Sequence, residues 1–313
     1  MADAHAATFS IEAERLTKRF GVTPALNGFD LALPWAEVTA LVGPNGAGKT
    51  TLLLILASLL APDSGHARVG GADTVQQPKE VHAAVGWMPD FFGVYDDLTA
   101  REYLELFAAA YRMNRNQSSA RATELIERLH LGPLADARVH TLSRGQKQKL
   151  GLARAIVQRP KVLLLDEPAS GLDPQGRMEL RDLVREEARA GATVLVSSHI
   201  LGDLEELADR VVFMEAGRCR QVATMAELPV LHAAREWRIR ALDPDGLMRA
   251  LSALGIEIVP QDRRGVVVSL RNEEHAAEVN AHLVSSGVAV VEFAPVQRAI
   301  EEAFMSLDRE RPA

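Results

Sequence analysis

The stretch that decides the fold is Gly43-Pro44-Asn45-Gly46-Ala47-Gly48-Lys49-Thr50, which reads GPNGAGKT. It follows an apolar run, residues 38–42, and it precedes a second apolar run, residues 51–60. This pattern predicts a buried strand, a glycine-rich loop and a helix, which is the setting of a phosphate-binding loop. Glycines permit a tight turn whose backbone N–H groups converge on one anion, and the following helix contributes the positive end of its dipole.

Two side chains of this loop suit a nucleoside triphosphate. Lys49 can reach the β- and γ-phosphates, and Thr50 can place its hydroxyl on Mg²⁺. The alternative is a glycine-rich turn that holds no ligand, which the flanking strand and helix patterns disfavour. We therefore predict that the loop binds ATP with Mg²⁺ through Gly43, Pro44, Asn45, Gly46, Ala47, Gly48, Lys49, Thr50 and Thr51.

Composition and charge limit the class of protein. The 313 residues are 47% hydrophobic and 25% charged, which is typical of a soluble globular protein with one large or two ordinary domains. The net charge of −7 argues against binding by phosphate neutralisation, so we expect no nucleic acid partner. The one cysteine, Cys219, cannot form an internal disulfide, which fits a reducing cytosol.

The sequence gives no sign of a targeting or membrane-spanning segment. The first ten residues, MADAHAATFS, lack the basic segment and apolar core of a signal peptide. The longest apolar stretch, residues 52–61, contains Ser58 and is followed by Pro62, so it is too short to cross a bilayer. We therefore expect any membrane association to depend on a partner.

Strand and helix patterns predict an α/β domain over residues 1–229. Apolar strands that alternate with helices indicate a mostly parallel sheet covered on both faces. Antiparallel strands are expected near the N-terminus, and a helical insert of about residues 90–160 interrupts the sheet. The expected strands are residues 10–20, 27–33, 37–42, 85–88, 162–165, 193–196 and 211–214, with later helices at 174–189 and 201–208.

The pattern then restarts, which predicts a small α+β domain over residues 230–313. Its expected strands are residues 237–242, 256–259, 265–270 and 288–293, with helices at 245–254, 273–286 and 296–307. Up to the last helix this is the β-α-β-β-α-β order of a ferredoxin-like fold.

Two adjacent carboxylates follow the expected strand at residues 162–165. Asp166 stands where the acidic residue of phosphate-binding-loop enzymes holds Mg²⁺. Glu167 comes next and is the natural general base for a water that attacks the γ-phosphate. Two solvated acids at a strand end are the alternative, and the upstream loop disfavours it. We predict ATP hydrolysis with Glu167 as the catalytic base.

Between these elements lies Leu142-Ser143-Arg144-Gly145-Gln146, and here the chain resembles the ATP-binding subunits of ABC transporters. Their signature is LSGGQ, so Arg144 replaces the first glycine. The resemblance continues through residues 170–173, SGLD, which match the D-loop, and through His199, which matches the switch histidine. Phe20 stands where the family places an aromatic ring on adenine. These motifs follow the family's order over residues 16–225.

The resemblance implies a dimer that encloses two ATP molecules. Ser143, Gly145 and Gln146 would face the γ-phosphate bound to the loop of a second subunit, with Asp173 also at the nucleotide. We therefore expect a homodimer, as the family forms it. Taken alone, Ser143 would be interpreted as a simple helix cap. The family also implies that His199 contacts the γ-phosphate and positions the water for Glu167.

Asp90 departs from the family pattern. The family has a glutamine after the strand at residues 85–88, and this chain has Asp90. Both side chains present an oxygen, so the hypothesis is that Asp90 senses Mg²⁺ and the attacking water and links them to the helical insert. The alternative is a solvated loop acid.

The resemblance also points to a partner and to a direction of transport. Residues 90–99 are expected to form an aromatic loop with Phe91, Phe92 and Tyr95. In the family this region contacts an integral membrane permease, and exposed aromatic side chains would suit such a contact. The alternative is that these side chains pack under the helices. The tail at residues 296–304 is similar to that of bacterial drug, antibiotic and sodium exporters. We therefore expect an export ATPase on the cytoplasmic face of the cell membrane.

Two other functions are alternatives to export for this chain. A non-transport ABC ATPase acting on DNA or ribosomes is disfavoured by the compact insert, the single phosphate-binding loop and the net negative charge. A regulator that binds nucleotide without turnover is disfavoured by the presence of Lys49, Asp166, Glu167 and His199.

Overall fold

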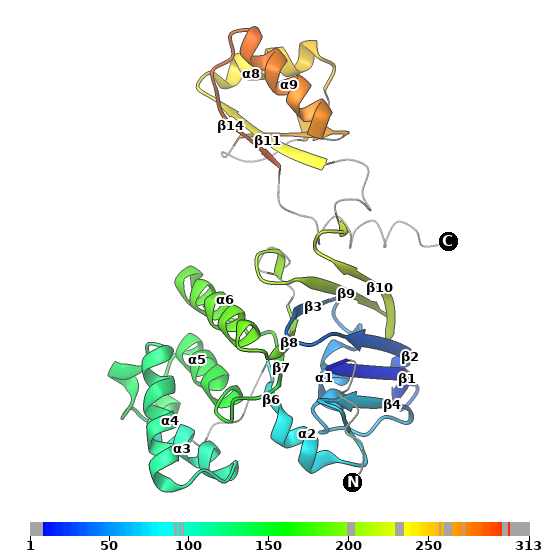
Figure 1. The fold of residues 1–313 in the computed structure, drawn as a ribbon. Coiled ribbons are helices and arrows are strands. Elements are labelled where there is room, and N and C mark those ends of the chain that lie inside the picture. Colours follow the sequence, from blue (N-terminus) through cyan, green and yellow to red (C-terminus); the bar gives the residue numbers. More distant parts are fainter. Residues whose placement is uncertain are drawn as a thin grey trace. The chain divides into compact units, whose positions relative to one another are not determined.

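The computed structural model describes residues 9–90, 93, 95, 97–198, 204–228, 235–256, 258–259, 265–271, 273–295 and 300. The chain divides into two compact units, residues 1–224 and 225–313 (Figure 1). His199, Phe91, Phe92 and most of the helix expected at residues 296–307 lie outside the described residues. Within the described part of the chain, no helix has the length and apolar character that crossing a membrane requires.

A six-stranded sheet forms the centre of the first unit. Its strand order is β10-β9-β3-β8-β7-β6, and all neighbours are parallel except the edge pair β9 and β10. Every residue of β3, β7 and β8 is buried, as expected for strands covered on both faces. The strands are β3 (Val38–Val42), β6 (Val85–Met88), β7 (Val162–Asp166), β8 (Thr193–Ser197), β9 (Arg210–Glu215) and β10 (Arg218–Thr224).

A second, antiparallel sheet lies beside the first, as the sequence predicts for the N-terminal strands. Its order is β2-β1-β4-β5. Leu52, Leu53 and Leu56 of helix α1 share one buried cluster with Ile11 and Phe29 of this sheet. The elements are β1 (Ile11–Phe20), β2 (Thr23–Leu33), β4 (Ser64–Val69), β5 (Ala72–Asp73), α1 (Lys49–Leu56) and the short helix α2 (Pro78–Ala84).

The helical insert contains α3 (Ala100–Ala110), α4 (Arg115–Arg128) and α5 (Arg144–Ala155). In Figure 1 these helices lie together near β6. Each begins with a reciprocal capping box, so the starts of all three are set by local sequence. The buried Arg121 of α4 donates to the carbonyls of Ile156 and Val157 at 2.6 and 3.0 Å, which fixes the end of α5.

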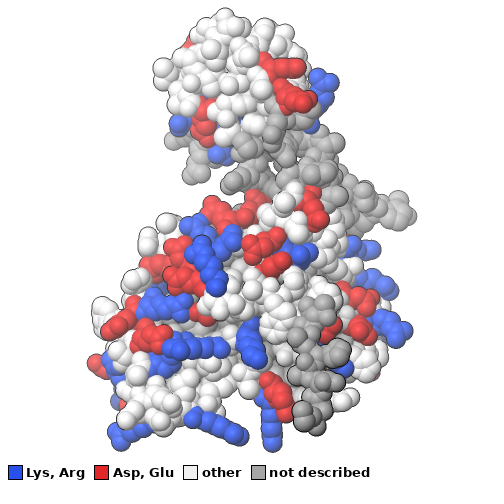
Figure 2. All heavy atoms as spheres, viewed as in Figure 1, with Lys and Arg blue, Asp and Glu red and all other residues white. Residues whose placement is uncertain are grey.

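Helix α6 (Pro174–Arg189) follows β7 and starts at its N-cap, Asp173. Charged residues of α6 pair with the insert: Arg128 bonds Glu186 and Glu187, and Lys149 bonds Glu179. Figure 2 accordingly shows acidic and basic side chains side by side on the visible face of this unit. These pairs hold α4 and α5 against α6.

The second unit has the predicted β-α-β-β-α-β order. It consists of β11 (Arg235–Ala241), α8 (Pro244–Ala253), β12 (Ile258–Val259), β13 (Val266–Leu270), α9 (Glu273–Ser285) and β14 (Val290–Pro295). The sheet order is β12-β13-β11-β14, with all neighbours antiparallel. Its core includes Ile239, Leu251 and Leu283, together with the ring pair Trp237 and Phe293 at 5.4 Å.

Candidate nucleotide-binding site

The site lies where parallel strands of the six-stranded sheet end. Asp166 is the last residue of β7, Ser197 is the last residue of β8, and Gly43 directly follows β3. Because β8 pairs with both β3 and β7, their carboxyl ends meet at one edge of the sheet. This is the edge at which parallel α/β sheets bind ligands.

The glycine-rich loop is held tightly against its neighbours. Gly48 has φ 104° and is the N-cap of α1, so an L-residue there would be strained. A Cβ atom on Gly48 would lie 2.2 Å from the carbonyl oxygen of Ala25, and one on Gly43 would lie 2.2 Å from that of Met214. Both glycines are therefore required by the packing of the loop on the first and second sheets.

Lys49 is folded over the same loop. Its Nζ atom donates to the carbonyl oxygens of Gly43 and Pro44 at 2.7 and 3.2 Å, and the residue is only 8% exposed. Burial lowers the pKa of Lys49, and the Glu167 and Asp166 carboxylates oppose this shift. The amine thus lies within the loop, close to both carboxylates, where it can exchange carbonyl oxygens for phosphate oxygens.

Asp166 receives two hydroxyl donors. Thr50 Oγ1 donates to Asp166 Oδ2 at 2.7 Å, and Ser197 Oγ donates to Asp166 Oδ1 at 2.5 Å. Among the described residues, no three His, Cys, Asp or Glu side chains gather as a metal cage. The hydroxyl and carboxylate of Thr50 and Asp166 are nevertheless hard oxygen ligands side by side. They fit Mg²⁺, which takes one or two protein ligands and completes its shell with phosphates and water.

The backbone of Glu167 is fixed in a left-handed conformation, with φ 51°. Its N–H donates to the carbonyl and the hydroxyl of Ser197 at 3.2 and 3.1 Å. Its carbonyl accepts from Gln148 Nε2 at 3.1 Å and from Ser170 N at 3.0 Å. A non-glycine residue keeps such a conformation only when its surroundings hold it there.

The signature residues lie at the start of α5. The exposed Ser143 is the N-cap, where its hydroxyl accepts from Gln146 N at 3.3 Å and its own N–H donates to Gln146 Oε1 at 2.9 Å. Asp173 has a similar position on α6, where Oδ1 accepts from Gly176 N at 2.8 Å. These two side chains therefore cap helices within their own chain.

The other predicted residues are more dispersed. Phe20 ends β1 and is 54% exposed, and Asp90 is exposed just after β6. The structure brings together Lys49, Thr50 and Asp166, with Glu167 close by. Sequence reasoning missed Ser197 and Gln148; a serine directly after the apolar run at residues 194–196 was the available signal for the first.

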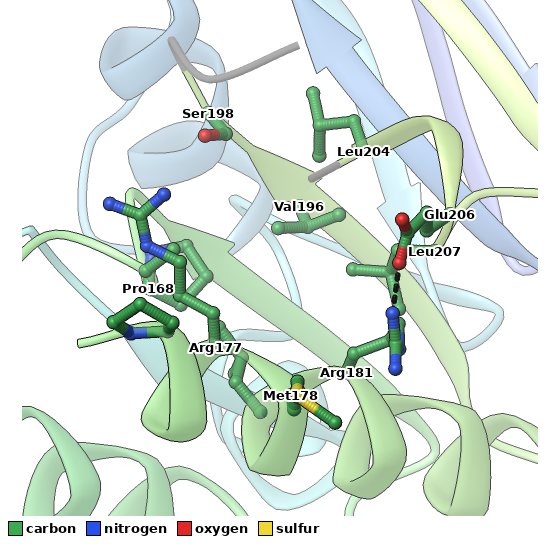
Figure 3. Close-up of a pocket in the computed structure, with 12 residues that line it drawn as sticks. Pro168, Arg177, Met178, Arg181, Val196, Ser198, Leu204, Glu206 and Leu207 are labelled. Carbon is green, nitrogen blue, oxygen red and sulfur yellow. Dashed lines mark hydrogen bonds and ion pairs between the residues drawn. The ribbon is translucent and has the colours of Figure 1, made fainter. Parts of the chain in front are cut away.

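A cavity of about 450 Å³ lies beside the loop that follows Glu167 (Figure 3). It lies between α6 and β8, with Pro168, Met178 and Val196 on its walls and the Arg181–Glu206 ion pair at one side. None of the residues that line it belongs to the glycine-rich loop. The cavity is therefore separate from the cluster around Lys49.

Comparison with known proteins agrees with this geometry. Residues 26–170 match the protein family described as ABC transporter. The daunorubicin/doxorubicin resistance ATP-binding protein of Streptomyces peucetius is 33% identical over 305 residues, covering 96% of this chain and 92% of that protein. A probable multidrug ABC transporter ATP-binding protein of Escherichia coli is 45% identical over 204 residues, covering 64% of this chain and 35% of that protein.

Solved structures show the same fold. A dimeric ATP-binding cassette in a post-hydrolysis state, bound to ADP and phosphate, has a TM-score of 0.64 and 25% identity. That comparison covers 69% of this chain and 98% of the cassette.

Proposed function

The chain belongs to the ATP-binding subunits of ABC transporters, and its relatives include a drug-resistance protein and a probable multidrug transporter protein. We propose that it dimerises around two Mg·ATP and powers a separate export permease. ATP hydrolysis itself follows from the family. The observation that carries the proposal is the cluster of Lys49, Thr50 and Asp166, with Glu167 held directly beside it.

The proposed mechanism assigns each residue a task. The loop N–H groups and Lys49 bind the phosphates, and Phe20 stacks on adenine. Thr50 and Asp166 would hold Mg²⁺, which would supply positive charge that offsets the charge of the phosphates. Glu167 accepts a proton from the water that attacks the γ-phosphate in line, and the products are ADP and phosphate. His199 contacts the γ-phosphate and positions the water for Glu167, as its motif position predicts. Asp90 senses Mg²⁺ and the attacking water and links them to the helical insert.

The dimer is proposed from the start of α5. Ser143 is exposed, and Ser143, Gly145 and Gln146 offer a hydroxyl and N–H groups at a positive helix end. In the proposed dimer these groups meet the γ-phosphate on the partner's loop, so each chain completes the site of the other. Release of phosphate removes the charge that holds the two chains together.

Replacing Ser143 with alanine tests this arrangement. Ser143→Ala is expected to lower ATP turnover at least about tenfold, the value of one lost charge-assisted hydrogen bond, while ATP binding to the monomer stays unchanged. Turnover and equilibrium nucleotide binding are measured on the same protein.

The control is Asn114→Ala, because Asn114 caps α4 in the same way and lies outside the signature. Both variants lose a helix cap, at about 1 kcal/mol of stability. If Asn114→Ala lowers turnover as much as Ser143→Ala, the loss reflects helix stability and the proposed contact is refuted.

The permease contact is proposed near the expected loop at residues 90–99. A cavity of about 310 Å³ is lined by Trp87, which precedes this loop in the sequence, and by Leu59, Phe107 and Tyr111 among others. Leu59 is 55% exposed although it is apolar, which suits a protein contact. Through such a contact the chain would lie on the cytoplasmic face of the membrane.

A pull-down tests the transport function. The full chain carrying Glu167→Gln, which should retain ATP, is expressed in its native host, held in Mg·ATP and recovered from detergent-solubilised membranes. A polytopic membrane protein is expected to co-purify, whereas a Lys49→Met chain, which should bind ATP more weakly, should recover less of it. Recovery with ribosomes or DNA instead would support the non-transport alternative and refute the export proposal.

A further inference from the structure

Helix α5 contacts the loop after β7 through two side chains on one face. Gln148 Nε2 donates to the carbonyl oxygen of Glu167 at 3.1 Å, and Arg144 Nη2 donates to Ser170 Oγ at 2.6 Å. Residues four apart lie on the same side of a helix, so Arg144 and Gln148 form one contact surface. Gln148 thus contacts the loop after β7, here called the catalytic loop, at Glu167, and Arg144 contacts it at Ser170.

Close packing brings the two segments together at the same place. Gly171 has φ 76°, and a Cβ atom on it would lie 2.8 Å from Cδ of Arg144. A Cβ atom on Gly145 would lie 3.2 Å from the carbonyl oxygen of Gly171. The stem of Arg144 therefore rests directly on Gly171, so the arginine contributes packing as well as a hydrogen bond.

Glu167 is thus held from two sides. Its N–H donates to Ser197 at the end of β8, and its carbonyl accepts from Gln148 of the helical insert as well as from Ser170 N in its own loop. Gln148 is only 5% exposed, and its amide reaches outside its own helix. The orientation of both peptide groups of Glu167 sets the direction of its side chain, because φ of this residue is already confined to 51°.

We propose that Arg144 and Gln148 are positioning residues that orient Glu167 from the helical insert. The inference rests on the proposed role of Glu167 as the base. Arg144, which replaces the usual glycine of the signature, gives this chain a second attachment between α5 and the catalytic loop. Any displacement of α5 then changes the orientation of the Glu167 carboxylate relative to the attacking water. The rate of ATP turnover therefore depends on the position of the helical insert.

The test uses Gln148→Met, which keeps the length and burial of the side chain and removes its donor. Turnover is expected to fall about tenfold, the effect of one lost hydrogen bond, while the affinity for N-methylanthraniloyl-ATP changes less than about twofold. Arg144→Gly is expected to lower turnover less, by about threefold, and Arg144→Lys, which restores a donor, is expected to return toward the wild-type rate.

Gln158→Met is the matched control. Gln158 also donates its amide to a backbone carbonyl, but that carbonyl belongs to Val85 of β6, at 2.8 Å, and not to the loop after β7. Loss of this hydrogen bond in Gln158→Met should leave the rate of ATP turnover unchanged. Equal losses in Gln148→Met and Gln158→Met, or a parallel loss of nucleotide affinity in Gln148→Met, would identify a purely structural role and overturn the inference.

Combination with Glu167→Gln separates this inference from the proposed function. In that background Gln148→Met should change the residual turnover less than about twofold, because the positioned carboxylate is already gone. A further tenfold loss there, or normal turnover in Gln148→Met alone, overturns the positioning role and leaves the base assignment intact. Normal turnover in Glu167→Gln alone overturns the base assignment and the positioning role with it.

Discussion

Replacing Glu167 with glutamine is expected to reduce ATP turnover about 10²- to 10⁴-fold, the usual contribution of a general base. The amide keeps the size of the side chain but cannot accept the proton of the attacking water. The backbone of Glu167 is held by Ser197 and Gln148 through main-chain atoms, so the substitution leaves the loop in place. ATP binding is therefore expected to persist.

A variant that binds but does not hydrolyse ATP should accumulate as the closed dimer. Size-exclusion chromatography in Mg·ATP is expected to show a dimer for Glu167→Gln and a monomer after nucleotide removal. Glu186→Gln is the control, because Glu186 forms a half-exposed ion pair with Arg128 and such pairs contribute little. Wild-type turnover in Glu167→Gln would show that another group accepts the proton.

Replacing Lys49 with methionine is expected to weaken ATP binding roughly tenfold to a hundredfold, because a hydrogen bond to a charged group contributes about 1.5–3 kcal/mol. Methionine keeps most of the apolar stem and removes the ammonium group. Equilibrium binding of Mg·ATP measures the effect. Lys161→Met, at an exposed position just before β7, should bind as the wild type does. Equal affinity in the two variants would exclude a phosphate contact for Lys49.

The wild type and Lys49→Met are expected to differ in how their affinity for ATP depends on pH. Burial lowers the pKa of Lys49, so in the free protein its charge is present at low pH and is lost at a lower pH than for an ordinary lysine. Wild-type affinity for ATP should therefore fall as the pH rises into the alkaline range. Lys49→Met has no such group to titrate, and its weaker affinity should change less over that range.

The fold was predictable where burial is complete. Strands β3, β7 and β8 are buried along their whole length and mostly apolar, and the sequence predicts each of them to within about a residue. The short elements β4, β5, α2 and β10 were not identified. Only Val81 of α2 is buried, and β4 and β10 alternate buried with exposed or half-exposed residues, so their periodic signals are weak.

The candidate site was predictable to the extent that its residues lie in contiguous motifs. Lys49, Thr50 and Asp166 follow from the loop and from the strand that ends in two acids. Ser197 and Gln148 do not, because each acts through hydrogen bonds to residues far away in the chain: Ser197 bonds Asp166 and Glu167, and Gln148 bonds Glu167. Such a contact depends on how β8 and α5 pack around β7, and no local pattern records it.

The close approach of Gly43 and Gly48 to the carbonyls of Met214 and Ala25 affects how activity is inferred in divergent relatives. These glycines satisfy a packing demand that exists whether or not nucleotide is bound. A descendant that had lost hydrolysis would still be selected to keep them, simply to remain folded. The bonds that fix the backbone of Glu167 run through its N–H and its carbonyl, which any replacement other than proline would retain. The identity of this one residue should therefore report loss of catalysis in a lineage earlier than the glycine pattern does.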